Sequence, residues 1–383
     1  MLLCIVVVFY YYIDKMKKII FIILLTLASI HVLAQDARIA HPFLWNSYYN
    51  PAYCGSERML KVDLGAQSTY SHKPSLFLDS HFSVEVPWET SNVSWGTGVK
   101  VSNQYQGSGL LNIASISPVV SIGVRLYTSS NIYSFLQVGV EFNSYSTKTN
   151  FNKIVFSDQL DPYYGLYKDF SEELSYLADD NIWTFDMAAG IYGQTSIRNH
   201  RLPIVIKYGF SVFHLVSDKE KSFYSKEEAI IHMPSFYNRR FCANVEYVQP
   251  IEIGRGKNVF LGGYGIYEFQ GGMHDIQVGF NTAYKWFTLG VGAKVERYTP
   301  TYTLSNIILT AVYSQWFDNN KYNLKLAYSF EFPITQGFVS ETSIHSLSLH
   351  FCYNYSTSNR RFSCKNYSAP SDAAWYEYSN ALR

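Results

Sequence analysis

The chain has 383 residues and a formal net charge of +1, which provides no strongly charged surface for nucleic acid or an anionic membrane. Aromatic residues make up 17% of it, including 33 Tyr and 26 Phe, and an excess of tyrosine is typical of the aromatic girdles of membrane β-barrels. Beyond the N-terminus the sequence contains neither a Pro/Gly/Ser-rich linker nor a shift in composition. One large all-β unit is therefore favoured over two or three soluble domains.

Two apolar runs open the chain, at 2–13 and 19–33, and neither reaches the roughly 20 residues that a transmembrane helix needs. From Met16 the sequence follows the form of a Sec signal peptide, with a basic pair, an apolar core and small residues before the expected cut. We predict a signal peptide over 1–34, with Met16 as an alternative start. The other interpretation is an uncleaved anchor, because the first run adds hydrophobicity. Both interpretations predict an exported chain.

A turn motif lies in the next segment, 35–58, which we predict to be a periplasmic N-terminal segment before the first strand. The motif is formed by Asn50, Pro51, Ala52, Tyr53 and Gly55. An Asn-Pro pair starts a turn, the tyrosine anchors it, and the glycine supplies backbone freedom. Taken alone, Asn-Pro-Ala is a common turn.

Alternation of apolar and polar residues with a period of two predicts about fourteen strands after this segment. It is cleanest between Asp275 and Glu296, where two strands form a hairpin with almost no turn. The expected strands are 59–70, 75–86, 92–104, 115–127, 132–147, 182–195, 203–213, 236–248, 257–268, 274–284, 286–297, 304–315, 321–332 and 344–355.

The length of the apolar face separates a membrane barrel from a soluble sandwich or propeller. A sandwich core about 10 Å thick needs two or three apolar positions per strand, whereas these strands offer about five in roughly ten residues, which fits a tilted strand crossing a bilayer. Charged residues stand at the alternate positions and would be costly if they faced lipid. We expect the following charges to face the lumen: Lys100, Arg125, Glu141, Lys325 and Glu331.

Loop length provides an independent indication. Every connection after an even-numbered strand is short, whereas the two longest connections, 148–181 and 214–235, follow odd-numbered strands. We therefore predict an all-β fold, a transmembrane antiparallel up-and-down β-barrel of about 14 strands over 59–355. It should have short periplasmic turns and long extracellular loops. Residues 356–383 form a C-terminal tail.

Catalytic and metal motifs are missing from the sequence: there is no His-Glu-x-x-His, no Gly-x-Ser-x-Gly and no Cys-x-x-Cys. The stretch 254–257 lacks the spacing of a phosphate-binding loop. We assign no catalytic residue, cofactor or metal and expect no enzyme, although the scattered histidines leave a metal site or a His-Ser outer-membrane hydrolase open as alternatives. The acidic runs 158–161 and 169–180 are read as solvated surface, with calcium binding as the alternative.

Four cysteines, at 54, 242, 352 and 364, would remain after removal of the first residues, and their wide spacing matches no zinc or redox motif. We expect free or packed thiols. A disulfide between Cys352 and Cys364 is the alternative in an oxidising compartment.

A family resemblance runs through most of the chain. The N-terminal aromatic segment with its Asn-Pro-Ala-Tyr-x-Gly motif is similar to that of the PorP/SprF family, outer-membrane proteins linked to the type IX secretion system of the Bacteroidetes. Further segments that resemble the family are Phe156–Pro162, Gly209–Leu215 and Ser343–Leu349. The chain departs from the family at 343–346, where Ser-Ile-His-Ser replaces a Gly-Ser-His-Glu-like pattern, and in the long tail.

The resemblance implies an outer-membrane barrel that works with the secretion machinery and docks or anchors a secreted adhesin or other cargo at the cell surface, in support of secretion, gliding or adhesion. Implied partners are outer-membrane lipid, the secreted cargo and secretion-system components, and no nucleic acid. The two long loops are the expected recognition surface. Candidate partner-binding residues on them are Asp158, Asp161, Pro162, His214 and His232. The alternative function is a passive porin or small-solute transporter.

Overall fold

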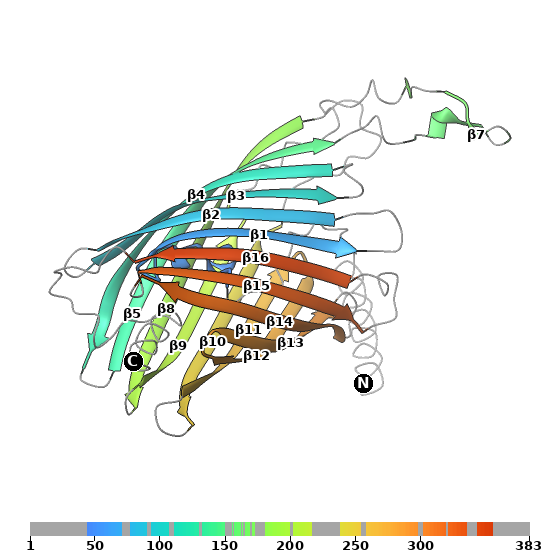
Figure 1. Ribbon diagram of the computed structural model, residues 1–383. Coiled ribbons are helices and arrows are strands. Elements are labelled where there is room, and N and C mark those ends of the chain that lie inside the picture. The colour runs from blue at the N-terminus through green and yellow to red at the C-terminus, as the bar shows by residue number, and fades with distance from the viewer. Residues whose placement is uncertain are drawn as a thin grey trace, which may run out of the picture. The chain divides into compact units, whose positions relative to one another are not determined.

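The computed structural model describes residues 44–70, 77–89, 93–106, 111–129, 132–149, 155, 157–161, 163, 165–168, 171–172, 181–199, 202–216, 238–253, 258–297, 302–318, 321–334 and 343–354. Within these residues, fourteen strands form one closed antiparallel barrel (Figure 1). The predicted signal peptide 1–34 and tail 356–383 lie outside the described residues.

Each strand of the barrel pairs with its neighbours in chain order, and the first strand pairs with the last. The strands are β1 (Leu60–Tyr70), β2 (Phe77–Glu89), β3 (Val93–Gln106), β4 (Leu111–Thr128), β5 (Ile132–Thr149), β8 (Asn181–Asn199), β9 (Leu202–Phe213), β10 (Arg240–Glu252), β11 (Asn258–Gln270), β12 (Met273–Tyr284), β13 (Phe287–Arg297), β14 (Thr303–Phe317), β15 (Tyr322–Pro333) and β16 (Ser343–Tyr353). This confirms the predicted fold class and strand number.

The two faces of the sheet differ as the alternation predicts. Large apolar side chains such as Leu64, Val120 and Phe280 are exposed on the outside, while polar side chains such as Asp63 and Gln137 are buried on the inside. This is the inverse of a soluble protein, and it places hydrocarbon rather than a protein core against the apolar face.

One strand is displaced from its expected position, since β10 begins and ends four residues later than predicted. The predicted strand ended at Val248, two residues before Pro250, a residue type that lacks the N–H used by a central strand. In the structure β10 continues through Pro250, which is a Cα partner of Phe260 on β11. The last residues of the strand, Ile251 and Glu252, also pair with β11.

The long connection between β5 and β8 contains ordered structure that periodicity did not predict. A 3-10 helix, η3 (Ser157–Gln159), leads into a small hairpin of β6 (Leu160–Asp161) and β7 (Gly165–Leu166). None of the helices in the described part of the chain is long and apolar enough to span a bilayer.

The segment that precedes β1 lies inside the barrel. It contains helix α2 (Asn46–Tyr49) and the 3-10 helix η1 (Pro51–Tyr53), and its side chains contact lumen-facing residues of strands on several sides of the barrel. We call residues 44–59 the plug. The sequence analysis predicted 35–58 as a periplasmic segment, of which 35–43 lie outside the described residues. Residues 44–58 lie in the lumen instead, because a local turn motif carries no information about what the turn packs against.

Candidate functional site: the plugged lumen

The plug is anchored by Asn50, whose side chain is fully buried at 0% exposure. Its Oδ1 accepts a hydrogen bond from the backbone N–H of Ala52 at 2.9 Å, which caps η1 at the position where Pro51 supplies a fixed φ. Its Nδ2 donates to the backbone oxygens of Ile191 at 2.8 Å and Phe210 at 3.4 Å. One asparagine thus both forms the turn and fixes it to β8 and β9.

The end of the motif is held by strands that follow β8 around the barrel, namely β5, β4 and β2. The carbonyl oxygen of Cys54 accepts hydrogen bonds from Ser121 Oγ and Gln137 Nε2, both at 2.7 Å. The N–H of Gly55 donates to Glu85 Oε2 at 3.1 Å. Gly55 has φ of +70°, a left-handed conformation that favours glycine. The predicted role of the motif glycine in backbone freedom is therefore seen directly.

The wall beneath the motif is a row of small residues that we call the small-residue row. Its members are direct Cα partners on five adjacent strands: Gly96, Ser121, Gly139, Gly190 and Ser211. A Cβ at Gly139 would lie 2.6 Å from the backbone of Ala52, and one at Gly190 would lie 2.0 Å from Asn50 Oδ1. The absence of side chains here lets the plug backbone approach the sheet.

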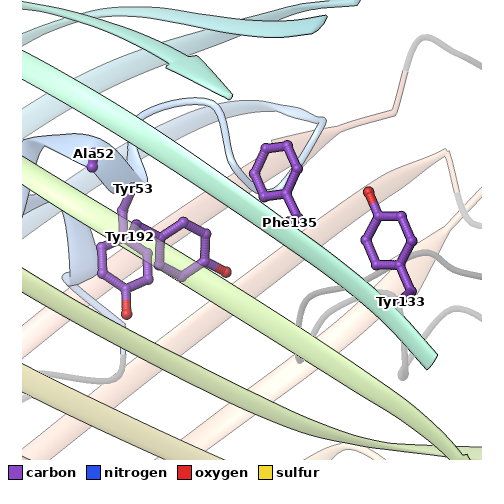
Figure 2. Packing of buried hydrophobic residues seen from close by; sticks show 5 residues of the cluster. All are labelled: Ala52, Tyr53, Tyr133, Phe135 and Tyr192. Carbon is purple, nitrogen blue, oxygen red and sulfur yellow. The ribbon is translucent and has the colours of Figure 1, made fainter. Parts of the chain in front are cut away.

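Aromatic packing fills the space beside this row. The rings of Tyr53 and Tyr192 lie side by side, with centroids 4.0 Å apart, and Tyr133 and Phe135 follow along β5 (Figure 2). Asn244 Nδ2 donates to the Tyr53 hydroxyl oxygen at 2.5 Å. Burial raises the pKa of Tyr53 well above its ordinary value, so the phenol stays neutral.

The first half of the plug is held mainly through its carbonyl groups. Ser211 Oγ donates to Tyr49 O at 2.5 Å, Lys100 Nζ to Ser47 O at 3.0 Å and Lys61 Nζ to Leu44 O at 3.4 Å. The indole ring of Trp45 packs edge-on against the His350 ring, with centroids 5.2 Å apart. Arg240 lies over the ring of Tyr48. The barrel wall therefore satisfies backbone groups that a short helix leaves without partners.

The five charges expected in the lumen are found at these places. Lys100 and Glu141 form an ion pair beneath the plug. Glu331 accepts a hydrogen bond from Asn306 Nδ2 at 2.9 Å, and Lys325 lines a cavity. Arg125 is half-buried next to an irregularity in the β4–β5 register.

Further lumen charges were not among the five expected. Two buried ion pairs join neighbouring strands, Lys207 with Glu246 and Arg240 with Glu268, while Lys294 pairs with Asp275 on β12 and with Glu296 on its own strand. The signal that could have found them is the same as for the expected charges, because each occupies the polar register of its strand.

A chain of hydrogen bonds joins Asp63, His350 and Ser348 in the order of a serine hydrolase. Asp63 Oδ1 lies 2.7 Å from His350 Nδ1, and His350 Nε2 lies 3.0 Å from Ser348 Oγ. However, Ser348 is only 1% exposed, and Asp63 also pairs with Lys61 at 3.2 Å. A nucleophile must be reachable by its substrate, whereas this serine is enclosed. The geometry fits a structural network beneath Trp45.

Two cavities of about 70 Å³ each are lined by plug residues and barrel residues. One includes Gln104, Tyr145 and Phe213, which lie toward the strand ends that carry the long loops. The other includes Phe260 and Ala283, which lie toward the short turns. Each has room for a few water molecules. The plug thus lies between two small cavities.

The candidate partner-binding residues are not brought together as one site. Asp158 accepts hydrogen bonds from Ser171 Oγ at 2.6 Å and Glu172 N at 2.8 Å, and Asp161 accepts one from Tyr163 N at 2.8 Å. These bonds shape the extracellular hairpin. Pro162 and His232 lie outside the described residues.

His214 does not occupy the expected surface position. It is 2% exposed, with Nδ1 placed 2.5 Å from Asp186 Oδ2. Asp186 also accepts a hydrogen bond from Val216 N at 3.2 Å. The histidine therefore anchors the start of the loop, because a buried ring next to a carboxylate gains more from that bond than from facing water.

Comparison with known proteins gives a family for the whole barrel. Residues 33–351 match the family described as type IX secretion system membrane protein PorP/SprF. A comparison with curated proteins found no match.

Among solved structures, the chain is similar to CdiB from Acinetobacter baumannii, with 9% identity and a TM-score of 0.42 over 77% of this chain, and it spans 60% of the length of CdiB. It is also similar to a Pseudomonas aeruginosa FadL homologue, with 10% identity, a TM-score of 0.42 and coverage of 81% of this chain and 93% of that one. The toluene transporter TodX of Pseudomonas putida shows 10% identity, a TM-score of 0.40 and coverage of 84% and 95%. These similarities carry no argument about function. The family match covers both the plug and the strands, and the chain belongs to the PorP/SprF family of type IX secretion system membrane proteins.

Proposed function

We propose that this outer-membrane barrel docks or anchors a secreted protein, such as an adhesin or other cargo, at the cell surface for the type IX secretion system. The observation that carries the proposal is the plug, which lies in the lumen and is bonded to β2, β3, β4, β5, β8, β9 and β10. A barrel whose interior is filled by its own chain acts through its surface rather than its pore.

The alternative, a passive porin or solute transporter, needs an open polar lumen. Here the Asn50 turn occupies part of the lumen, and it is bonded to the nearby strands β8 and β4. Opening a path would break several buried hydrogen bonds, each contributing about 1 kcal/mol. The bonding of the plug therefore favours docking over transport.

The extracellular hairpin offers a surface suited to docking. Tyr163 and Tyr167 are 92% and 71% exposed, and Leu160 and Leu166 are also exposed beside them. The hairpin is pre-ordered, since Gln159 O accepts from Tyr167 N at 2.8 Å. Exposed aromatic side chains on a fixed backbone bind at a low entropic cost.

The surrounding loop is acidic. Residues 148–181 contain three lysines against seven aspartates and glutamates. A partner that fits this surface presents apolar pockets for the two tyrosines and a basic rim. Electrostatic attraction of this kind mainly raises the rate of encounter.

The test is an affinity pull-down from outer membranes followed by mass spectrometry. The double variant Tyr163→Ser/Tyr167→Ser should lose the large secreted partner that the unmodified protein retains. Tyr105→Ser, which removes an exposed tyrosine from β3, is the matched control and should retain it. Equal recovery by all three proteins would contradict docking at the hairpin.

Planar bilayers test the alternative. The intact protein should show no defined single-channel steps, whereas a variant lacking 44–58 should show them, because the lumen polar groups would then line an open path. Regular steps from the intact protein would instead favour the porin.

We also propose that the barrel has no hydrolase activity. A fluorophosphonate probe should leave Ser348 unlabelled in the folded protein, because the serine is enclosed beneath the plug. Labelling that is lost in Ser348→Ala and in Asp63→Asn would refute this.

A further inference from the structure

An outward-facing cluster of His274, Arg297 and Tyr302 lies at one rim of the barrel. His274 and Arg297 are direct Cα partners across β12 and β13. The ring centroids of His274 and Tyr302 are 6.2 Å apart, and the guanidinium carbon of Arg297 lies 5.3 Å from the Tyr302 centroid. Three side chains that can bind an anion or support its binding therefore converge from two strands and the connection after them.

The cluster has a fixed geometry. Tyr267 Oη lies 2.7 Å from His274 Nδ1, and the Phe269 ring packs 4.8 Å from the His274 ring, so the imidazole is held in one orientation. In the tautomer in which Nδ1 accepts the tyrosine hydroxyl, Nε2 carries the proton and is a donor.

The position of the cluster along the strands sets its depth in the membrane. His274 follows the tight turn at Gly271–Gly272, on the side of the barrel where the long connections lie. Below it on the same outward face are apolar residues, Ile276 and Val278 on β12 and Val295 on β13. A lipid whose acyl chains lie along these residues would bring its headgroup to His274 and Arg297.

We propose that His274 and Arg297 form a binding site for a phosphate group on a lipid headgroup of the outer leaflet. Arg297 carries a positive charge and His274 can donate through Nε2, and because the two residues lie directly opposite each other in the antiparallel pair, one anion can contact both. An arginine fork matches the geometry of a phosphate, and the hydrogen bonds are charge-assisted. The proposal is separate from docking of the secreted partner.

The barrel contains its own control for this site. On β15 and β16 the same arrangement recurs, with Tyr328 Oη 2.8 Å from His345 Nδ1 and the Phe330 ring 4.7 Å from the His345 ring. There the Cα partner of His345 on the next strand is Ser68 instead of an arginine. His345 Nε2 also lies 3.3 Å from Ser343 Oγ. The repeat therefore has the aromatic frame but has a serine in place of the arginine.

The test is native mass spectrometry of the full-length protein in detergent, with lipid A that carries phosphate and with the same lipid A after phosphatase treatment. The unmodified protein should retain the phosphorylated form about tenfold more strongly. Arg297→Gln and His274→Gln should each remove most of that preference, and Arg297→Lys, which keeps the charge but loses the fork, should remove part of it. His345→Gln should keep the full preference.

Heat-dependent migration on a denaturing gel shows whether each variant is folded. If Arg297→Gln does not fold, the preference of Arg297→Lys for phosphorylated lipid A is measured in its place. Equal retention of both lipid forms by the unmodified protein would overturn the proposal, as would an equal loss in Arg297→Gln and His345→Gln. Displacement of the lipid by inorganic phosphate at matched concentration would overturn the assignment to a lipid headgroup.

Discussion

Replacing Gly139 with alanine places a methyl group where the plug backbone lies. A Cβ at this position would be 2.6 Å from Ala52 Cα, Ala52 N and Pro51 C, and all three atoms are backbone. Ordinary van der Waals contact begins near 3.4 Å. The turn must therefore move away from β5 by about 1 Å, since no flexible side chain can yield instead.

The cost follows from the bonds that the turn makes. A displacement of about 1 Å stretches the bond from Asn50 Nδ2 to Ile191 O, now 2.8 Å, and the two 2.7 Å bonds to Cys54 O beyond hydrogen-bond range. Three bonds at about 1 kcal/mol each give about 3 kcal/mol. The population with the plug displaced should then rise roughly 100-fold.

Labelling of Cys54 measures this population. The thiol is 1% exposed, and burial raises its pKa, so it should react with maleimide only when the plug moves. Peptide mass spectrometry measures the extent of maleimide labelling at each cysteine separately. Cys352 on β16 is buried too and reports unfolding of the whole barrel. Gly139→Ala should therefore speed labelling of Cys54 about 100-fold while Cys352 stays protected.

Gly263→Ala is the matched control, because a Cβ there meets only Gly279 O, at 3.9 Å. It also lies within a strand, and it should leave labelling of Cys54 unchanged or slightly slower, since alanine reduces the entropy of the unfolded chain. Equal labelling rates in Gly139→Ala and Gly263→Ala would refute the argument that the missing side chain seats the plug.

Three further outcomes are expected. Asn50→Ala removes three hydrogen bonds and should cost about 3 kcal/mol, read as a lower urea midpoint of unfolding; an unchanged midpoint would contradict the anchor role. Lys100→Met leaves the Glu141 carboxylate buried without its partner and should lower the free energy of unfolding by about 3 kcal/mol. The double variant Lys100→Met/Glu141→Leu should recover most of that stability. A double variant as unstable as Lys100→Met would argue against a role of the ion pair. Hydrogen bonds from Ser171 and Glu172 hold the pKa of Asp158 below its ordinary value. Protection of the Glu172 amide from hydrogen exchange should therefore be complete above the ordinary pKa of an aspartate and should be lost as pH falls through the lowered pKa of Asp158. Asp158→Asn should remove this pH dependence.

The fold could be predicted because alternation and loop length are local signals that recur along the chain. Each of the fourteen strands has its own row of apolar residues, such as Phe287, Leu289 and Val291 on β13, and each row favours a membrane strand. A closed barrel is the arrangement that leaves no unpaired strand edge in lipid. The error at β10 has the same origin, because a prediction from local alternation ended the strand at Val248. Pairing with β11 continues the strand through Pro250 to Glu252.

The plug could not be predicted because its evidence is divided between distant parts of the chain. The motif around Asn50 signals a turn, and each glycine of the small-residue row is ordinary by itself. Their relation becomes visible only when strand register places Gly96, Gly139 and Gly190 in one line. The burial of His214 was missed for a similar reason, since its partner Asp186 lies on another strand.

The small-residue row also has an evolutionary consequence. Asn50 and Ala52 contact residues that lie far along the chain, so a substitution in the motif is tolerated only with a compensating substitution in the small-residue row. We expect these positions to covary among relatives. The Asn-Pro-Ala-Tyr-x-Gly motif would then be retained because it packs against the inner wall of the barrel.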